Sequence, residues 1–172
     1  MSEDAAAARI IGTLEGRGET LSAAESCTGG GILAALTSVP GSSAVVWGGV
    51  VAYANDAKTS LLGVDPRIIE GEGAVSSAAA RAMAWGMKAR SGSDWAVAVT
   101  GIAGPGGGSE DKPVGTVWIA WTGPGLPPEA ERFLFDGDRE AVRRSAAARA
   151  LEGLDSRVTR RSALDRDANG LL

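Results

Sequence analysis

Hydrophobic positions change their spacing along the chain, from a helical period to a strand period and back. Apolar residues recur every three or four positions in three segments, which predicts amphipathic helices. These helices span residues 5–17, 77–90 and 138–154. Valine-rich or alternating runs predict strands between them. The predicted strands span residues 19–25, 44–54, 94–100, 114–122 and 132–135.

Turn residues predict two shorter helices. Three glycines at 29–31 follow the first strand and open a helix through Leu36, which Pro40 ends. Asn55 can cap a second short helix that runs through Leu62. Strand, glycine loop and helix therefore follow one another near the start of the chain.

Strands mixed with helices in this order predict an α/β protein. We expect a single-domain, three-layer α/β/α sandwich, with helices on both faces of a mixed sheet. The domain is expected to cover residues 1–155, and the polar tail at 156–172 is expected to fray.

Composition narrows the classes of partner. The chain has 172 residues, with 17 basic and 21 acidic side chains and a net charge of −4. No basic stripe is present, so nucleic acid is not an expected partner. The longest apolar stretch, at 44–54, contains Gly48 and Gly49 and is too short for a membrane helix. With one cysteine and no signal-peptide pattern at the start, we expect a cytoplasmic protein.

The absence of histidine limits the chemistry most strongly. The chain contains none, which excludes a Ser-His-Asp triad, a Cys-His pair and most zinc sites. A hydrolytic site in this chain must use a different base.

Small and polar residues are concentrated at three predicted strand ends, in segments 24–31, 41–58 and 100–116. Loops at strand ends form the ligand cleft in open α/β sheets, so the three segments can surround one site. In the first segment, Thr28 and the glycines after it suit an anion at a helix start, or only an N-cap and a tight turn. Cys27 is expected to be a small packed residue.

The second segment contains candidates for nucleophilic catalysis. Without histidine, a serine nucleophile needs a neutral lysine or a tyrosinate as its base. Tyr53 and Lys58 lie five residues apart across a strand-to-helix junction, after Ser42 and Ser43. A position in the first helical turn would lower the pKa of Lys58, because the helix dipole disfavours an ammonium there. The alternative is a solvated lysine and a strand aromatic.

The glycine-rich third segment resembles a nucleotide loop only superficially. Residues 104–108 lead into a strand, so the helix N-terminus that binds pyrophosphate is missing. A lid over the cleft is the functional alternative, with Thr100 as a hydroxyl at the strand end.

Five motifs in order give the chain a family resemblance. AESCTGG, GSS with GGVVAYANDAK, GAVS, TGIAGPGGGSEDKPVGTVW and FDGDREAVR are similar to the nicotinamide-nucleotide amidase family, which is also the carboxy-terminal part of CinA proteins. The resemblance covers about residues 5–155. It implies hydrolysis of nicotinamide mononucleotide, a pyridine nucleotide, to nicotinic acid mononucleotide and ammonia, without a metal or cofactor. It also implies a homodimer.

The resemblance assigns roles to particular residues. It makes Ser43 the nucleophile, with Lys58 and Tyr53 as base partners and Thr100 as a further hydroxyl of the catalytic group. The expected substrate-binding residues are Ser26, Thr28, Gly29, Gly30, Arg139 and Arg143. The phosphate is expected on residues 28–30 or on Arg139, with Arg143 as the alternative one helical turn further on.

Two other functions stay open. One is a non-catalytic nucleotide-binding module of the same fold, against which the intact Ser43, Tyr53 and Lys58 argue. The other is an amidase for a different carboxamide. The chain also departs from the family pattern at Glu72, where relatives often have histidine, and no activity of the large amino-terminal CinA domain is expected.

Overall fold

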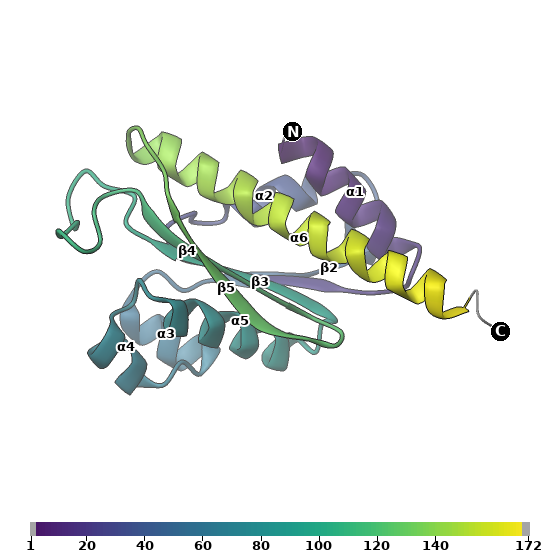
Figure 1. Ribbon diagram of the computed structural model, residues 1–172, viewed down its shortest axis with the longest axis horizontal. Helices are drawn as coiled ribbons and strands as arrows, with labels where there is room; N and C mark the ends of the chain where they lie inside the picture. The colour runs from purple at the N-terminus through teal and green to yellow at the C-terminus, as the bar shows by residue number, and fades with distance from the viewer. Residues whose placement is uncertain (1–2, 170–172) are drawn as a thin grey trace.

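A computed structural model describes residues 3–169, and the side chains of 4–161, as one mixed sheet with helices on both faces (Figure 1). The helices are α1 (Glu3–Glu15), α2 (Gly31–Thr37), α3 (Asn55–Leu62), α4 (Pro66–Glu72), α5 (Ser77–Ser91) and α6 (Arg139–Asn169), with a 3-10 turn η1 at Ser42–Ala44. The strands are β1 (Leu21–Glu25), β2 (Val46–Val51), β3 (Trp95–Gly101), β4 (Thr116–Gly123) and β5 (Leu126–Leu134).

The strand order in the sheet is β2-β1-β3-β4-β5. β1 pairs in parallel with both β2 and β3, whereas β4 runs antiparallel to β3 and to β5. In the register of the parallel strands, Glu25 lies opposite Val51 on one side and Val99 on the other. The carboxyl ends of three neighbouring strands therefore meet at one edge of the sheet, as ligand sites of α/β proteins require.

Two hydrophobic clusters hold the layers together. α1, α2 and α6 cover one face of the sheet, and α3, α4 and α5 cover the other (Figure 1). Trp95 and Trp121 are buried in the larger cluster, under α1 and α6, whereas the smaller cluster contains Leu62 of α3 and Met83 of α5. The predicted three-layer sandwich with a mixed sheet is confirmed.

Several element boundaries differ from the prediction. α4 was not predicted, although Asp65 caps it through the amide N–H of Arg67 and Pro66 begins it. β5 is longer than the segment 132–135, because it begins before two prolines and pairs along the whole of β4. α6 continues to Asn169 where we expected a polar tail.

The continuation of α6 past residue 155 has a packing reason. Val158 is buried in the larger cluster, and the guanidinium of Arg157 lies 4.0 Å from the ring centroid of Trp121. A cation over the indole face is an attractive contact. The domain core therefore includes a turn of helix beyond the predicted boundary.

One glycine brings α3 close to α5. A Cβ atom at Gly86 would lie 1.8 Å from the carbonyl oxygen of Leu62, so no larger residue fits there without a backbone shift. Because of this contact, the last turn of α3 packs closely against α5. The first turn of α3, which contains Lys58, lies at the carboxyl ends of β1 and β2.

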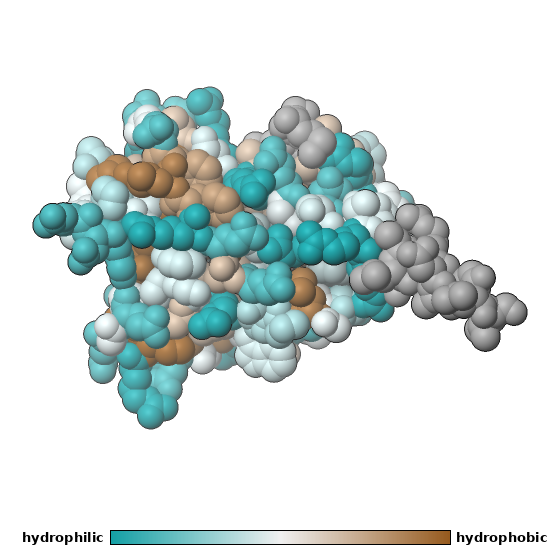
Figure 2. Space-filling view, viewed as in Figure 1, coloured by the Kyte–Doolittle hydropathy of each residue, from teal (hydrophilic) through white to brown (hydrophobic). Residues whose placement is uncertain are grey.

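Hydrophilic side chains spread across the face formed by β5 and α6, with smaller hydrophobic areas on either side (Figure 2). The large apolar or aromatic residues that stay exposed are Trp47, Val51, Tyr53, Leu61, Trp85 and Leu134. Among the described helices, none has the length and apolar character needed to cross a membrane.

Candidate active site

A pocket of about 270 Å³ opens at the carboxyl edge of the parallel strands. Ser26 follows β1, Tyr53 follows β2, Lys58 projects from α3 and Thr100 comes from the end of β3, and all four line the pocket. Arg139, at the start of α6, closes it on the outer side. The structure thus brings together five of the predicted site residues, and it moves Ser26 from the predicted substrate-binding residues to the candidates for chemistry.

Lys58 is buried and makes three polar contacts. It is 2% exposed. Its Nζ lies 3.0 Å from the carbonyl oxygen of Ala52, 3.1 Å from that of Tyr53 and 3.1 Å from Oγ of Ser26. Two partners are carbonyl oxygens, which only accept hydrogen bonds, and the third is a hydroxyl, which can donate or accept.

This set of partners accommodates both protonation states of the amine. An ammonium donates one N–H to each of the three oxygens, whereas a neutral amine donates to the two carbonyls and turns its lone pair to the hydroxyl of Ser26. Burial disfavours the ammonium and holds the pKa of Lys58 below its ordinary value. The lowering was predicted, but burial rather than the helix dipole is its main cause, and Ala54, not Asn55, is the N-cap of α3.

The structure separates Ser43 from this lysine. Ser43 lies in η1, before β2 begins, whereas Tyr53 and Lys58 come after β2 ends. The strand between them spans about 17 Å at roughly 3.3 Å per residue. Ser43 is exposed and lines neither this pocket nor the neighbouring one described below. The predicted pairing of Ser43 with Lys58 is therefore corrected: the hydroxyl beside the amine belongs to Ser26.

Tyr53 and Thr100 lie in the pocket in arrangements that the sequence did not predict. The phenol of Tyr53 is well exposed and accepts a hydrogen bond of 2.7 Å from Arg139, whereas its backbone carbonyl accepts from Lys58. Tyr53 thus contacts the lysine through its main chain. Thr100 is buried and donates its hydroxyl hydrogen to the carbonyl of Ala74 at 2.8 Å.

A buried carboxylate occupies the turn after Ser26. The Glu25 side chain, at the end of β1, accepts hydrogen bonds from the amides of Gly30, Ile32 and Leu33 at 2.9, 3.2 and 2.9 Å. It is fully buried. These are the first amides of α2, so the chain supplies its own anion to the helix start.

This contact occupies part of the predicted phosphate site on residues 28–30, whose role in substrate binding stays a prediction. The amide of Gly30 already donates to Glu25, and that of Gly29 donates to the carbonyl of Ser26. A second anion there would face the carboxylate, which repels it. The Glu25 carboxylate instead fixes the turn that carries Ser26.

Replacing Glu25 with glutamine is expected to destabilise the fold. The amide NH₂ would point a donor at backbone donors, and at least one buried N–H would lose its acceptor. We expect the free energy of unfolding to fall by about 3 kcal/mol, the sum expected for a lost charge-assisted bond and an unpaired donor. Chemical denaturation would measure the loss, with the exposed Glu70→Gln as the matched control. Equal stability of the two variants would contradict the stabilisation of this turn by the Glu25 carboxylate.

Two arginines of α6 reach this edge of the sheet. Arg139 donates to the phenol of Tyr53 and, at 2.8 Å, to the carbonyl of Gly104 in the glycine-rich loop. Arg143 donates to the carbonyls of Cys27 and Thr28 at 3.2 and 3.0 Å. Both guanidinium groups therefore bind neutral partners, and within the described side chains neither forms an ion pair.

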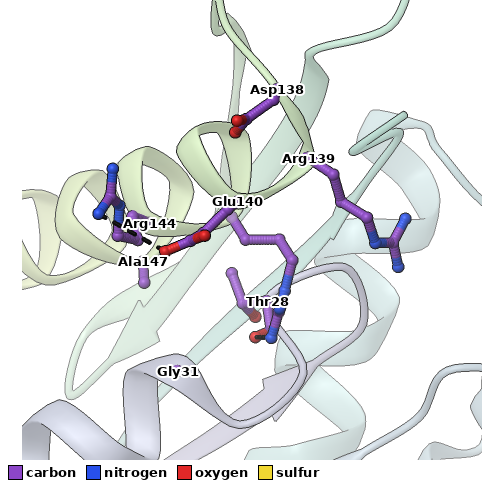
Figure 3. A pocket seen from close by; sticks show the side chains of 8 residues that line it. Thr28, Gly31, Asp138, Arg139, Glu140, Arg144 and Ala147 are labelled. Atoms are coloured by element: carbon purple, nitrogen blue, oxygen red, sulfur yellow. Dashed lines mark hydrogen bonds and ion pairs between the residues drawn. The ribbon is translucent and has the colours of Figure 1, made fainter. Parts of the chain in front are cut away.

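A second, larger pocket of about 630 Å³ adjoins the first and shares Arg139 with it. It lies between the turn that contains Thr28 and the first turns of α6 (Figure 3). Cys27, between Ser26 and Thr28, is buried, and burial raises the pKa of its thiol to about 11. This cysteine is therefore a packed residue, as predicted. The side chains that the structure describes include no cluster of three His, Cys, Asp or Glu suited to a metal.

The fold and the pocket together define a class: a three-layer α/β domain with a buried serine–lysine pair at the carboxyl edge of its parallel strands. The chain belongs to the CinA C-terminal domain family, which matches residues 3–158. The predicted family resemblance is confirmed.

Individual relatives agree with this assignment. A Pseudomonas putida protein named nicotinamide-nucleotide amidohydrolase PncC is 58% identical over 132 residues, which are 78% of this chain and 81% of that protein. A CinA-like protein from Synechocystis is 52% identical over 160 residues, 91% of this chain but 38% of the relative. The chain thus spans about two fifths of the length of the CinA-like relatives it matches.

Solved structures show the same fold. A competence/damage-inducible protein from Agrobacterium tumefaciens superposes with a TM-score of 0.87 at 44% identity, covering 91% of this chain and 98% of that one. A competence damage-inducible protein from Klebsiella pneumoniae gives a TM-score of 0.88 at 38% identity, covering 92% and 98%.

Proposed function

We propose that this protein is a nicotinamide-nucleotide amidohydrolase in which Ser26 is the nucleophile and Lys58 is its base. The observation that carries the proposal is the 3.1 Å contact between Ser26 Oγ and a buried amine whose other partners are two carbonyls. The name of the Pseudomonas putida relative supports the substrate class. In this proposal Ser26 takes the nucleophile's role from Ser43, and Lys58, Tyr53 and Thr100 line the same pocket.

In the proposed reaction, neutral Lys58 takes the proton of Ser26 while Oγ attacks the carboxamide carbon. The resulting ammonium of Lys58 then gives its proton to the amide nitrogen, and ammonia leaves as the C–N bond breaks. Ser26 now carries an ester. Lys58 accepts a proton from water as the oxygen of that water attacks the ester carbon. When the ester C–O bond breaks, Lys58 returns the proton to Oγ of Ser26, and the carboxylic acid product leaves and loses its own proton to solvent.

The oxyanion of each tetrahedral intermediate needs donors beside Ser26. The backbone hydrogen bonds of the described turn use neither the amide of Cys27 nor that of Thr28. The amide that follows a nucleophilic serine at a strand-to-helix turn is a common oxyanion donor. We assign the Cys27 amide to this role. Thr100 is less suited to it than predicted, because its hydrogen is bonded to Ala74.

The test is an incubation of the purified protein with nicotinamide mononucleotide, following ammonia and nicotinic acid mononucleotide together. Equal amounts of both products are expected. Nicotinamide riboside, run in parallel, separates the proposal from an amidase for another carboxamide, since it keeps the reacting amide and lacks the phosphate. Binding of the mononucleotide without any ammonia would favour the non-catalytic module. The cytoplasmic location and the homodimer stay predictions.

A further inference from the structure

A third pocket lies at the other end of the sheet from Ser26 and Lys58. This hairpin pocket has a volume of about 150 Å³ and lies between residues 124–126, at the turn from β4 to β5, and residues 157–161 of α6. Trp95 at the start of β3 lines it, whereas Thr100 near the end of the same strand lines the active-site pocket. No described residue lines both pockets, so a ligand bound here would not occupy the proposed active site.

Apolar side chains form the inner wall of the hairpin pocket. Trp95 is buried, and its indole N–H already donates to Glu19 at 2.7 Å. Pro124 and Leu126 come from the turn, and Leu126 packs against the larger hydrophobic cluster. The volume is well below the roughly 300–1,000 Å³ of sites for drug-sized ligands. This wall therefore suits one small ring and leaves no room for a nucleotide.

Three arginines of α6 converge on the open side of the pocket. Arg157, Arg160 and Arg161 are three and four residues apart, which places them on one face of the helix, and all three line the pocket. Like charges at this spacing repel one another. Among the described lining residues, Glu129 is the single acidic one. The lining therefore carries an excess of positive charge.

The acidic residue of the pocket is already engaged by one of these arginines. The guanidinium of Arg157 lies 3.4 Å from the Glu129 carboxylate and 2.8 Å from that of Glu131, which also lies on β5. These two glutamates together compensate the charge of Arg157. They leave the charges of the other two arginines to the pocket and to solvent.

Those two arginines differ in their contacts. Arg161 donates to the carbonyl of Pro124 at 2.6 Å, which connects α6 to the turn at the edge of the pocket. Arg160 is exposed, and no hydrogen bond or ion pair joins it to another described residue. The guanidinium of Arg160 is therefore available to an anion whose remaining part lies in the pocket.

We infer that the hairpin pocket binds a small aromatic carboxylate, with its ring against Trp95 and Leu126 and its carboxylate on Arg160. A guanidinium binds a carboxylate through two parallel hydrogen bonds, and an aromatic ring packs well on an indole. An inorganic anion would leave the apolar wall uncovered, and a neutral ring would leave Arg160 without a partner. A fatty acid is too long for the volume. The inference does not depend on the proposed function.

The test is titration of the whole chain with sodium benzoate, followed in proton–nitrogen correlation spectra. The indole N–H signal of Trp95 and the amide signals of Gly125 and Leu126 should shift together, with a Kd on the order of 1 mM, as for a ligand of this size. Benzyl alcohol has the ring without the charge, and acetate has the charge without the ring. Each should bind about tenfold or more weakly, because it loses one of the two contributions.

One pair of variants tests the charge. Arg160→Glu places a negative charge where the carboxylate binds and changes no described contact, so it should weaken benzoate binding about tenfold or more. The matched control is Arg81→Glu, because Arg81 is an exposed arginine of α5 that lines none of the described pockets. Arg81→Glu should leave the affinity unchanged.

Three results would overturn the inference. The first is the absence of a saturable shift of the Trp95 and Leu126 signals. The second is a set of shifts confined to the turn that contains Ser26, which would place benzoate in the active-site pocket. The third is equal benzoate affinity in Arg160→Glu and Arg81→Glu. Because the titration needs no turnover, its outcome is independent of the amidase assay.

Discussion

Ser26→Ala is expected to lower ammonia release from nicotinamide mononucleotide by roughly three orders of magnitude or more, as for the loss of a catalytic nucleophile. The variant removes one hydroxyl at the end of β1, so the melting temperature should change little. Ser43→Ala is the matched control. Its hydroxyl is exposed at the opposite edge of the sheet, and its activity should equal that of the unmodified protein.

The two serine variants distinguish Ser26 from Ser43 as the nucleophile. A Ser26→Ala protein that keeps more than about a tenth of the activity would exclude Ser26 as the nucleophile. Loss of activity in Ser43→Ala with a normal melting temperature would restore the role that the family resemblance assigns to that residue. Ser43 would then need a base other than Lys58 of its own chain.

Replacement of Lys58 is expected to cost about 10²–10⁴-fold in rate, the usual contribution of a general base. In Lys58→Arg the guanidinium stays protonated and cannot accept a proton. Lys58→Met has an unbranched side chain of nearly the same length and no proton acceptor. Both should be nearly inactive for the same reason. Because arginine is bulky for a site 2% exposed, Lys58→Met is the variant expected to disturb the fold less.

The pH dependence has a definite sign. Only the neutral amine accepts the serine proton, so kcat should rise with pH through the pKa of Lys58 and then level off. Burial lowers that pKa, which moves the rise to a lower pH than an exposed lysine would give. Rates measured across the acid side in a constant ionic strength would locate it. A rate that stays flat from about pH 5 to 9 would contradict a base of this kind.

Local patterns predicted most of the fold because they arise from short-range physics. The helical spacing in 77–90 lies within one segment, and the structure confirms this helix as α5, which Ser76 caps. α4 was missed although its Asp-Pro start is a recognised helix signal. The first part of β5 was not predicted because its two prolines lower strand propensity. In the structure the pairing of β5 with β4 outweighs that local preference.

The candidate site was only partly predictable, for a geometric reason. Tyr53 and Lys58 are close in sequence and were found together, but the serine beside them comes from 32 positions earlier along the chain. Which strand lies next to β2 depends on the strand order, and no local pattern specifies it. The residue pattern offered Ser42 and Ser43, and the family resemblance assigned the nucleophile's role to Ser43, whereas in the structure β1 carries Ser26 to the edge where Lys58 lies.

The role of Glu25 was missed for a related reason. An acidic residue at the end of a strand usually faces solvent, and here it turns inward to three amides of the following helix. The available signal was its position six residues before a glycine-started helix that has no polar N-cap side chain. A helix start without a cap of its own needs an acceptor from elsewhere.

The central claim is a covalent bond between Ser26 and the substrate's acyl group. Rapid mixing of the protein with nicotinamide mononucleotide, followed by acid quench and mass spectrometry, measures it directly. The account predicts an adduct with the mass of the substrate less ammonia, which fragmentation localises to Ser26 and which Ser26→Ala lacks. An adduct on Ser43, or a first turnover that releases both products together with no adduct, would contradict it.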